Sequence, residues 1–498
     1  MIHRIATLLF LIILLGWQAC KTDLSGNRLP NQAPQTYTVA DTIARSGDNR
    51  FTSQVFIQWW GDDADGFIKG FEFSFDGLTW NFTEQQDSTF TLALPAGSDT
   101  ADFRFFVRAI DNNNLADPTP ANLSYPVKNS KPIASFFMPV GTPASPSKNP
   151  VSSFPALKYY FNYSDPDGAD NLDHLEFFLN DTTLAPFILP VTVNEVTLLG
   201  RNLSGSITDC QVFAGTSPNP LALFMQGLRL NANNMLYFRS VDKVGATSAF
   251  AASAITYVKK PINGILLVNA TFPVNATKLA YYCNALNAVG ISTFDTLQPF
   301  RVVNNNYTDL SPDYLTQSKV FRFFSKIIWF SDVDSIALSL AQRSTSDFFA
   351  NGGRMFMSVA FSQFMFETSP LLEFTPVKEI VPDTQGVFRM NINAPVVPLL
   401  SGWPNLKSNA ILSSARPYFK ALDNSQYTFA DLYKAEHTVT TPGGPLIYAG
   451  PGSVFTKRTE IAGSKTNMIF TSLPLERLDA NNNRDSIFRK IFIDELNF

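Results

Sequence analysis

The segment 264–360 constrains the fold of this chain most, because apolar strands and amphipathic helices alternate along it. An apolar run at 264–270 precedes apolar residues at helical spacing, and Gly290 stands where that helix would end. Further apolar runs at 326–332 and 354–359 follow other helical patterns. Strands that alternate with helices predict a mostly parallel sheet covered on both faces. The sequence therefore predicts an α/β doubly wound domain over 261–498.

Two upstream regions show apolar residues that alternate with polar ones. The region 37–128 holds such runs at 55–59, 71–75 and 103–109, and Asp-Gly turns separate several of them. The region 129–260 repeats this order of runs and turns, with an insertion around 184–220. Short, half-buried strands joined by such turns predict a β-sandwich. We therefore expect two copies of one sandwich fold, the second carrying the insertion.

The first 20 residues form a targeting signal. His3 and Arg4 precede an apolar stretch at 5–17, and the stretch ends at Ala19 and Cys20. The polar run 21–36 has no apolar period and predicts a flexible tether. This start resembles the signal of bacterial lipoproteins. The resemblance implies a lipid anchor at Cys20 and a place in the cell envelope, at the outer membrane or surface of a Gram-negative bacterium. An uncleaved signal anchor is the alternative.

Composition narrows the range of partners. The 498 residues carry a net charge of −4 and no basic cluster, so nucleic acid is not expected as a partner. Hydrophobic residues make up 45% of the chain, enough for several buried cores. Behind the signal only Cys210 and Cys283 remain, in different predicted domains, and we expect two free thiols rather than a disulfide.

One loop of the second sandwich carries carboxylates at a spacing close to that of calcium-binding loops. Asp165, Asp167, Asp170, Asp173 and Glu176 occupy loop positions one, three, six, nine and twelve. Position six normally needs glycine for a sharp turn, and here it is Asp170. The alternative is a polar turn that leads into a strand. Calcium is the one cofactor that the sequence suggests.

The C-terminal domain offers a second group of candidate residues. In open α/β sheets, ligands bind in the crevice at the carboxyl ends of the strands. At the ends of the predicted strands the chain carries Asn269, Ser331, Asp332 and Ser358. We expect these four residues to bind the ligand of this domain.

Two resemblances to known families follow from these runs. The two sandwiches resemble fibronectin type III or immunoglobulin-like modules of secreted bacterial proteins. The runs 264–270, 326–332 and 348–358 resemble the class I glutamine-amidotransferase-like fold. Active members of that family end the strand after a Gly pair in Gly-x-Cys-x-Gly, but this chain has Phe356-Met-Ser358-Val-Ala360. The resemblance implies an amidotransferase-like domain that lacks the catalytic cysteine.

Two hypotheses about function follow. The leading one is a non-catalytic, lipid-anchored binding or scaffold protein of the envelope that recognises a glycan, a peptide or a partner protein. The alternative is an extracytoplasmic serine hydrolase with Ser358, His437 and Asp332 as its triad, since triads are defined by geometry and not by chain order. The hydrolase requires a base within hydrogen-bond reach of the Ser358 hydroxyl.

Overall fold

A computed structural model describes residues 29–40, 54–92, 100–137, 142–166, 168–243, 245–363, 365–382, 386–413 and 415–498. The predicted signal, Cys20 and most of the tether lie outside these residues. The chain divides into two compact units, Met1–Ser130 and Lys131–Phe498. Of the described residues 42% are in strands and 13% in helices, so the protein is mostly β. Within the described part of the chain, no helix is long and apolar enough to cross a membrane.

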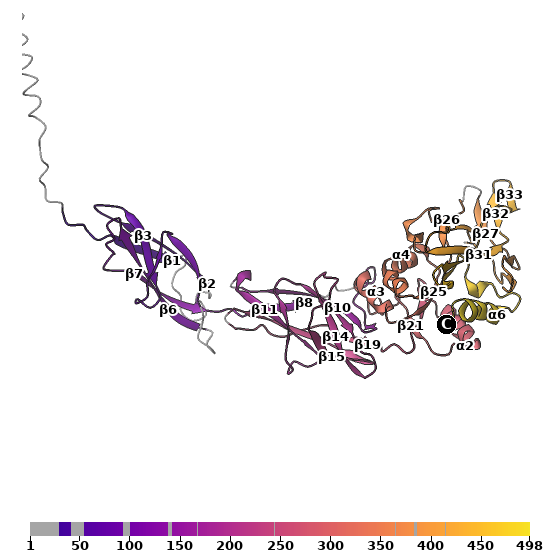
Figure 1. The fold of residues 1–498 in the computed structure, drawn as a ribbon, viewed down its shortest axis with the longest axis horizontal. Coiled ribbons are helices and arrows are strands. Elements are labelled where there is room, and N and C mark those ends of the chain that lie inside the picture. Colours follow the sequence, from indigo (N-terminus) through magenta and orange to yellow (C-terminus); the bar gives the residue numbers. More distant parts are fainter. Residues whose placement is uncertain are drawn as a thin grey trace, which may run out of the picture. The chain divides into compact units, whose positions relative to one another are not determined.

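The first unit is a β-sandwich of two antiparallel sheets, with strand orders β1-β2-β5 and β4-β3-β6-β7 (Figure 1). The predicted alternation holds, because Val55, Ile57 and Trp59 point into the core with exposed fractions of 5, 0 and 1%. Trp59 is surrounded by aromatic rings of both sheets, including Phe73 and Phe105. The strands are β1 Gln35–Ala40, β2 Gln54–Asp62, β3 Ile68–Ser74, β4 Asn81–Thr83, β5 Asp87–Thr91, β6 Thr100–Asp111 and β7 Ala121–Lys128.

The second unit begins with another sandwich, whose sheets have the orders β15-β14-β13-β10-β8 and β12-β11-β17-β18. The predicted insertion is no peripheral loop, since β12, β13 and β14 all arise within it and extend both sheets. The strands are β8 Ile133–Phe136, β9 Ser152–Ser153, β10 Ala156–Ser164, β11 Leu172–Leu179, β12 Phe187–Pro190, β13 Glu195–Gly200, β14 Ile207–Ala214, β15 Phe224–Arg229, β16 Ala232–Asn234, β17 Leu236–Asp242, β18 Ala251–Ala252 and β19 Thr256–Val258.

The rest of the second unit is built on a nine-stranded sheet of order β21-β20-β24-β25-β35-β34-β31-β28-β29. Its main strands are β20 Ile265–Asn269, β21 Asp295–Leu297, β24 Lys326–Ser331, β25 Arg354–Val359, β28 Pro395–Pro398, β29 Leu406–Lys407, β31 Tyr427–Ala435, β34 Phe455–Glu460 and β35 Lys465–Thr471. The predicted strands at 264–270, 326–332 and 354–359 are confirmed as β20, β24 and β25.

The expectation of a mostly parallel sheet is wrong. Four of its eight strand pairings are parallel, and the other four are antiparallel. The antiparallel half comes from the segment after β25, where strands follow one another without crossover helices, so their pairing direction reverses. Three small sheets complete this half and its surroundings, formed by β22 Val302–Val303, β23 Asn306–Tyr307, β26 Val377–Ile380, β27 Val387–Arg389, β30 Tyr418–Lys420, β32 Thr438–Thr441 and β33 Gly444–Ile447.

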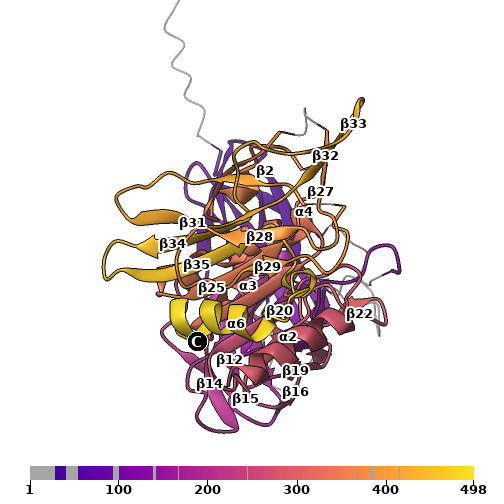
Figure 2. The same cartoon turned by 90° about the vertical axis from the view of Figure 1, so that its right-hand side faces the viewer.

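Helices cover both faces of the parallel half. The helical segments are α2 Ala276–Ala288, α3 Tyr314–Phe321, α4 Asp334–Ser344, α5 Ser346–Ala350, α6 Arg484–Phe488 and a π-helical segment Arg489–Glu495. Alternate residues of β20 pack on opposite faces, so Leu266 joins the core beneath α3, α4 and α5 whereas Leu267 joins the core beneath α2 and α6. Figure 2 shows α2 and α6 together in front of the sheet. Gly290, with a φ of 94°, follows the end of α2 as predicted.

The second sandwich and the nine-stranded domain share one core. Phe154 and Phe213 of the sandwich belong to the same buried cluster as Phe324 of the C-terminal domain. The Phe154 and Phe324 rings meet edge to face with centroids 4.9 Å apart. The Asp309 carboxylate accepts hydrogen bonds from the Ser152 hydroxyl at 2.6 Å and the Lys259 ammonium at 2.9 Å. The segments 131–260 and 261–498 therefore form one compact body, although the sequence predicted two separate domains.

Candidate binding sites

The polar residues predicted at the strand ends hold the local backbone together. Asn269 is fully buried at the end of β20, where its amide oxygen accepts from the Thr271 hydroxyl at 2.7 Å and its amide nitrogen donates to the Asn275 carbonyl at 3.2 Å. Ser331 ends β24, and its buried hydroxyl lies 2.7 Å from the Ala270 carbonyl oxygen. These groups shape the turn before α2, and their hydrogen-bonding capacity is taken up within the protein.

The third predicted residue, Asp332, lies beside a polar cavity. Its carboxylate accepts from the Phe272 backbone amide at 3.1 Å and lies 3.6 Å from the Lys278 ammonium. Lys278 also pairs with Glu476 at 3.1 Å. Beside these charges is a cavity of about 220 Å³, lined by Asn275, Thr277, Lys278, Tyr281, Glu476 and Arg477. A cavity therefore does lie near the carboxyl ends of the parallel strands, and of its two lining cations Lys278 is paired with two carboxylates.

Ser358 is a buried structural residue. It is 2% exposed within β25, and its hydroxyl donates to the Leu473 carbonyl at 3.1 Å. A nucleophilic serine would have to give that proton to a base. The neighbouring Phe356 is fully buried and packs edge to face on Phe492.

His437 lies between β31 and β32, where it is 1% exposed and packs edge to face against Phe388. Burial lowers the pKa of its imidazole to about 4, because a charged ring would lose its hydration. Its Nε2 atom has no hydrogen-bond partner in the described structure. Across the described residues, no hydrogen bond joins Ser358, His437 and Asp332. The structure thus does not assemble the proposed triad.

The carboxylates of the predicted calcium loop point to other partners. Glu176 lies within β11 and accepts from Arg239 of β17 at 2.5 Å. Asp173 pairs with the ring of His174 at 2.7 Å, and Asp165 accepts from the Asn171 amide at 3.3 Å. Asp167 lies outside the described residues. Among those described, no group of three or more His, Cys, Asp or Glu side chains could hold a metal ion.

A larger hollow lies at the edge of the second sandwich, where sequence analysis placed no site. Two adjoining cavities of about 470 and 460 Å³ share the residues Leu179, Asp181, Leu184 and Gln226. We call their common opening the sandwich groove. Its walls come from the end of β11, the following loop, β12, β14 and β15, and consist of Phe177 to Asp181, Leu184 to Ile188, Ile207 to Asp209, Leu223 to Gly227 and Arg229.

Asn180 holds the two walls of the groove together. It follows β11 with a φ of 66°, a left-handed conformation that asparagine tolerates better than most residues. Its amide nitrogen donates to the Gly227 carbonyl of β15 at 2.8 Å, while its amide oxygen accepts from the Met235 backbone amide at 2.9 Å. The walls are therefore fixed before any ligand arrives.

The groove lining is mainly apolar and open to solvent. Leu184 is 53% exposed, Leu223 73% and Phe224 41%. At one end the Arg201 guanidinium lies over the Phe224 ring at 3.7 Å and pairs with Asp209 at 2.8 Å. The groove thus offers an apolar floor with a neutralised ion pair at its rim.

The sequence contained a signal for this groove. Leu184 and Ile188 of the insertion, and Leu223 and Phe224 just after it, lie in or beside strands at positions where a solvent-facing residue would be polar.

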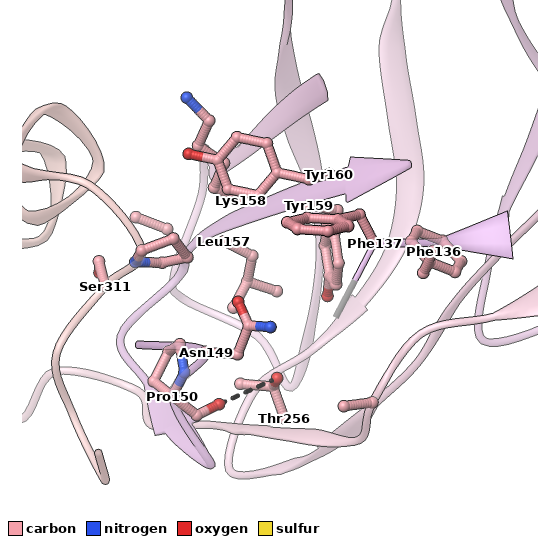
Figure 3. A pocket seen from close by; sticks show the side chains of 13 residues that line it. Phe136, Phe137, Asn149, Pro150, Leu157, Lys158, Tyr159, Tyr160, Thr256 and Ser311 are labelled. Atoms are coloured by element: carbon pink, nitrogen blue, oxygen red, sulfur yellow. Dashed lines mark hydrogen bonds between the residues drawn. The ribbon is translucent and has the colours of Figure 1, made fainter. Parts of the chain in front are cut away.

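A smaller cavity, of about 30 Å³, lies where the second sandwich meets the C-terminal domain (Figure 3). The side chains of Leu157 and Tyr159 extend into this region from β10, and Ser311 approaches from the other side. At this size the cavity holds about one water molecule. It is a packing gap at the junction, too small for an organic ligand.

The chain matches no family model and no curated protein. Among solved structures, the fibronectin(III)-like modules of Clostridium thermocellum CbhA match 45% of this chain and 94% of their own, at 13% identity and a TM-score of 0.17. A two-domain fibronectin type III segment of chicken tenascin matches 46% of this chain and 100% of its own, at 9% identity and a TM-score of 0.18. A carbohydrate-binding module of the β-sandwich superfamily matches 46% of this chain and 86% of its own, at 8% identity and a TM-score of 0.17. These scores are too low to carry an argument about function, so the sandwich assignment rests on the sheets themselves.

Proposed function

We propose that this protein is a non-catalytic, lipid-anchored binding or scaffold protein of the bacterial envelope, and that its sandwich groove takes up an extended apolar segment of a partner protein. The observation that carries the proposal is the groove itself. Each of its cavities falls in the range of about 300–1,000 Å³ that is usual for ligand sites. Exposed apolar side chains gathered in one hollow mark an interaction surface.

The strand arrangement around the groove favours an extended peptide over a compact ligand. β12 is the first strand of its four-stranded sheet and β15 is the first strand of its five-stranded sheet, so each pairs with a neighbour on one side only. An extended segment can pair with such a free edge while alternate side chains enter neighbouring pockets. The two adjoining cavities provide those pockets.

The proposed cellular location of the protein rests on its N-terminal sequence. The apolar stretch that ends at Cys20 supports a lipid anchor, and the polar residues after it support a tether that leads to the first sandwich. Under this proposal, the amidotransferase-like C-terminal domain has lost its catalytic cysteine and serves as a rigid support for the neighbouring sandwich. A glycan ligand is the competing possibility for the groove.

The experiment is a selection from a display library of extended peptides, followed by calorimetric titration of a selected peptide into the full chain in detergent. We expect the selected peptides to alternate apolar and polar residues. Leu223→Asp and Phe224→Ala should each weaken binding by about tenfold. The matched control is Ile133→Ser, which removes a 55% exposed apolar side chain from β8 of the same sandwich, outside the groove.

Hydrogen exchange gives a second readout. Peptide bound by strand addition should slow amide exchange in β12 or β15, and leave exchange in β8 unchanged. The proposal fails if selected peptides bind the groove variants as well as the unaltered chain. It also fails if the groove variants lose binding to neutral glycans while no peptide is selected.

A further inference from the structure

We infer a separate glycan-binding surface on the first sandwich, formed by the outer face of its β1-β2-β5 sheet. This surface is independent of the sandwich groove, since it belongs to the other compact unit. The residues concerned are Tyr37 on β1, Phe56, Gln58 and Trp60 on β2, and Asp87 on β5. The ligand class is an uncharged, extended polysaccharide with pyranose rings.

The strand register places these side chains on one face. Tyr37 is directly opposite Trp60 in the antiparallel β1-β2 pair, and Gln58 is directly opposite Asp87 in the β2-β5 pair. Directly opposed residues share a face, and residues two apart on a strand do so as well. The intervening residues of β2, among them Ile57 and Trp59, fill the core. The face opposite the core is therefore defined by Phe56, Gln58 and Trp60.

Two aromatic rings stand together on this face. Tyr37 and Trp60 are stacked, with centroids 5.6 Å apart and ring planes 17° apart. They remain 41 and 46% exposed, so each ring keeps a solvent-accessible surface beyond the one it gives to its partner. Aromatic rings offer a flat apolar surface against which the C–H face of a sugar ring can pack.

A third ring extends the surface along the strand. Phe56 is 39% exposed and lies four residues before Trp60 on β2. Four residues of extended strand span about 13 Å. That distance is longer than one sugar ring, so the surface matches an oligosaccharide rather than a single sugar.

The polar groups between the rings suit hydroxyl groups. Gln35, Gln58, Asp87 and Thr89 are exposed on this face, and the Tyr37 hydroxyl donates to the Gln35 amide oxygen at 3.0 Å. Amides and hydroxyls donate and accept hydrogen bonds, and a carboxylate accepts them, as sugar hydroxyls require. Among the described side chains of this face there is no Lys or Arg, and its charges are the carboxylates of Asp62, opposite Gln35, and Asp87. An acidic polysaccharide would be repelled, which is why we choose a neutral one.

The composition also argues against a protein partner on this face. Protein interfaces have a continuous apolar centre. Here Gln58 separates Trp60 from Phe56 along β2, and the exposed Val39 lies opposite Gln58, so apolar and polar side chains are interspersed. Aromatic rings with hydrogen-bonding groups beside them are the arrangement expected for a chain of sugars.

The test is titration of the full chain in detergent with cellohexaose and with soluble hydroxyethylcellulose, followed by calorimetry and tryptophan fluorescence. Both should bind, and Trp60→Ala and Tyr37→Ala should each weaken binding by about tenfold. Trp60→Phe keeps an aromatic ring and should lose less binding affinity than Trp60→Ala. Phe67→Ala is the control, because Phe67 is 67% exposed in the same sandwich but follows β2 rather than lying on this face.

A second pair of variants covers the case in which Trp60→Ala does not fold. Gln58→Ala and Asp87→Asn leave the aromatic stack in place and should weaken binding by about threefold or more each. The inference is overturned if neither neutral glucan binds, if Tyr37→Ala and Trp60→Ala bind as the unaltered chain does, or if an acidic polysaccharide such as alginate binds instead. Concentration-dependent self-association that Trp60→Ala abolishes, without glucan binding, would assign the face to a second copy. Leu223→Asp should leave glucan binding unchanged, which separates this test from that of the sandwich groove.

Discussion

The Lys158 ammonium lies 2.9 Å from the Asp313 carboxylate, and this ion pair joins the second sandwich to the N-terminus of α3. Lys158 projects from β10 and also pairs with Glu195 at 3.2 Å. Asp313 has a second task, because its carboxylate accepts from the Thr316 backbone amide at 2.7 Å and so caps the helix. One side chain thus couples the formation of α3 to the docking of the sandwich.

This double role can be separated by two substitutions of Asp313. Asparagine keeps a capping oxygen but loses the charge, whereas alanine loses both. We expect Asp313→Asn to lower the free energy of unfolding by about 1 kcal/mol and Asp313→Ala by about 2 kcal/mol, since the pair is partly exposed and its contribution is screened. Urea titration measures both values. Equal losses for the two variants would show that the cap contributes nothing.

The buried His437 makes stability depend on pH. Its pKa is about 4 in the folded chain, against an ordinary value of 6.5. The His437 imidazole takes up a proton at a higher pH in the unfolded chain than in the folded chain. Its contribution to the free energy of unfolding is therefore complete above about pH 6.5 and is lost as pH falls toward 4. The loss amounts to roughly 3 kcal/mol. Unfolding at pH 7, 5.5 and 4.5 should show this slope, and His437→Gln should flatten it.

His174 provides the control for that experiment. Its side chain is 27% exposed and lies beside Asp173, whereas His437 is buried. His174→Gln should leave most of the slope between pH 6.5 and 4 intact. A slope that survives His437→Gln unchanged would mean that other groups cause it.

Ser358 should behave as a structural residue. A fluorophosphonate probe, which labels activated serines, should leave the folded chain unlabelled. Ser358→Ala should lower stability by about 1 kcal/mol, because it removes one hydrogen bond to the Leu473 carbonyl. Labelling that disappears in Ser358→Ala would restore the serine hydrolase hypothesis, and a His437→Gln variant would then show whether that histidine is the base.

Calcium should have little effect on the second sandwich. Glu176, which would be the bidentate ligand of a calcium loop, is already paired with Arg239 across β11 and β17. We expect the melting temperature to be the same in 1 mM calcium and in EDTA, within about 1 °C. A rise of several degrees with calcium, abolished by Asp167→Asn, would contradict this and would establish the loop as a site.

Sequence reasoning found the elements whose residues carry a strict period. The alternation at Val55, Ile57 and Trp59 predicted a half-buried strand, and the apolar runs of β20, β24 and β25 predicted buried parallel strands. In both cases burial on a regular face leaves a pattern that can be read locally.

The antiparallel half of the large sheet could not be predicted in the same way. β28 and β31 lie in a stretch rich in proline and aromatic residues, and their partners are determined by packing against distant strands. β33 pairs with β32 in a small separate sheet rather than joining the large one. Pairing partners are a property of the whole fold, which a local pattern does not contain.

For the candidate sites too, sequence reasoning predicted what depends on a local pattern and missed what depends on residues distant in the sequence. The position of Asp332 near a cavity was predictable, because the carboxyl ends of parallel strands meet at one edge. The burial of Ser358 and His437 was not, since it depends on Leu473 and Phe388, which are distant in the sequence. A residue type can suggest chemistry, but only its surroundings decide whether that chemistry is available.

The core that Phe154 and Phe213 share with Phe324 limits how this protein can have changed by gene rearrangement. A module that buries its own apolar residues can be duplicated, lost or exchanged without harm to its neighbours. The first sandwich, a compact unit with its own core, meets that condition. Removal of the second sandwich would instead expose buried apolar residues of the C-terminal domain to solvent. Insertions and domain swaps among related genes should therefore concentrate before residue 131 and avoid the junction near residue 260.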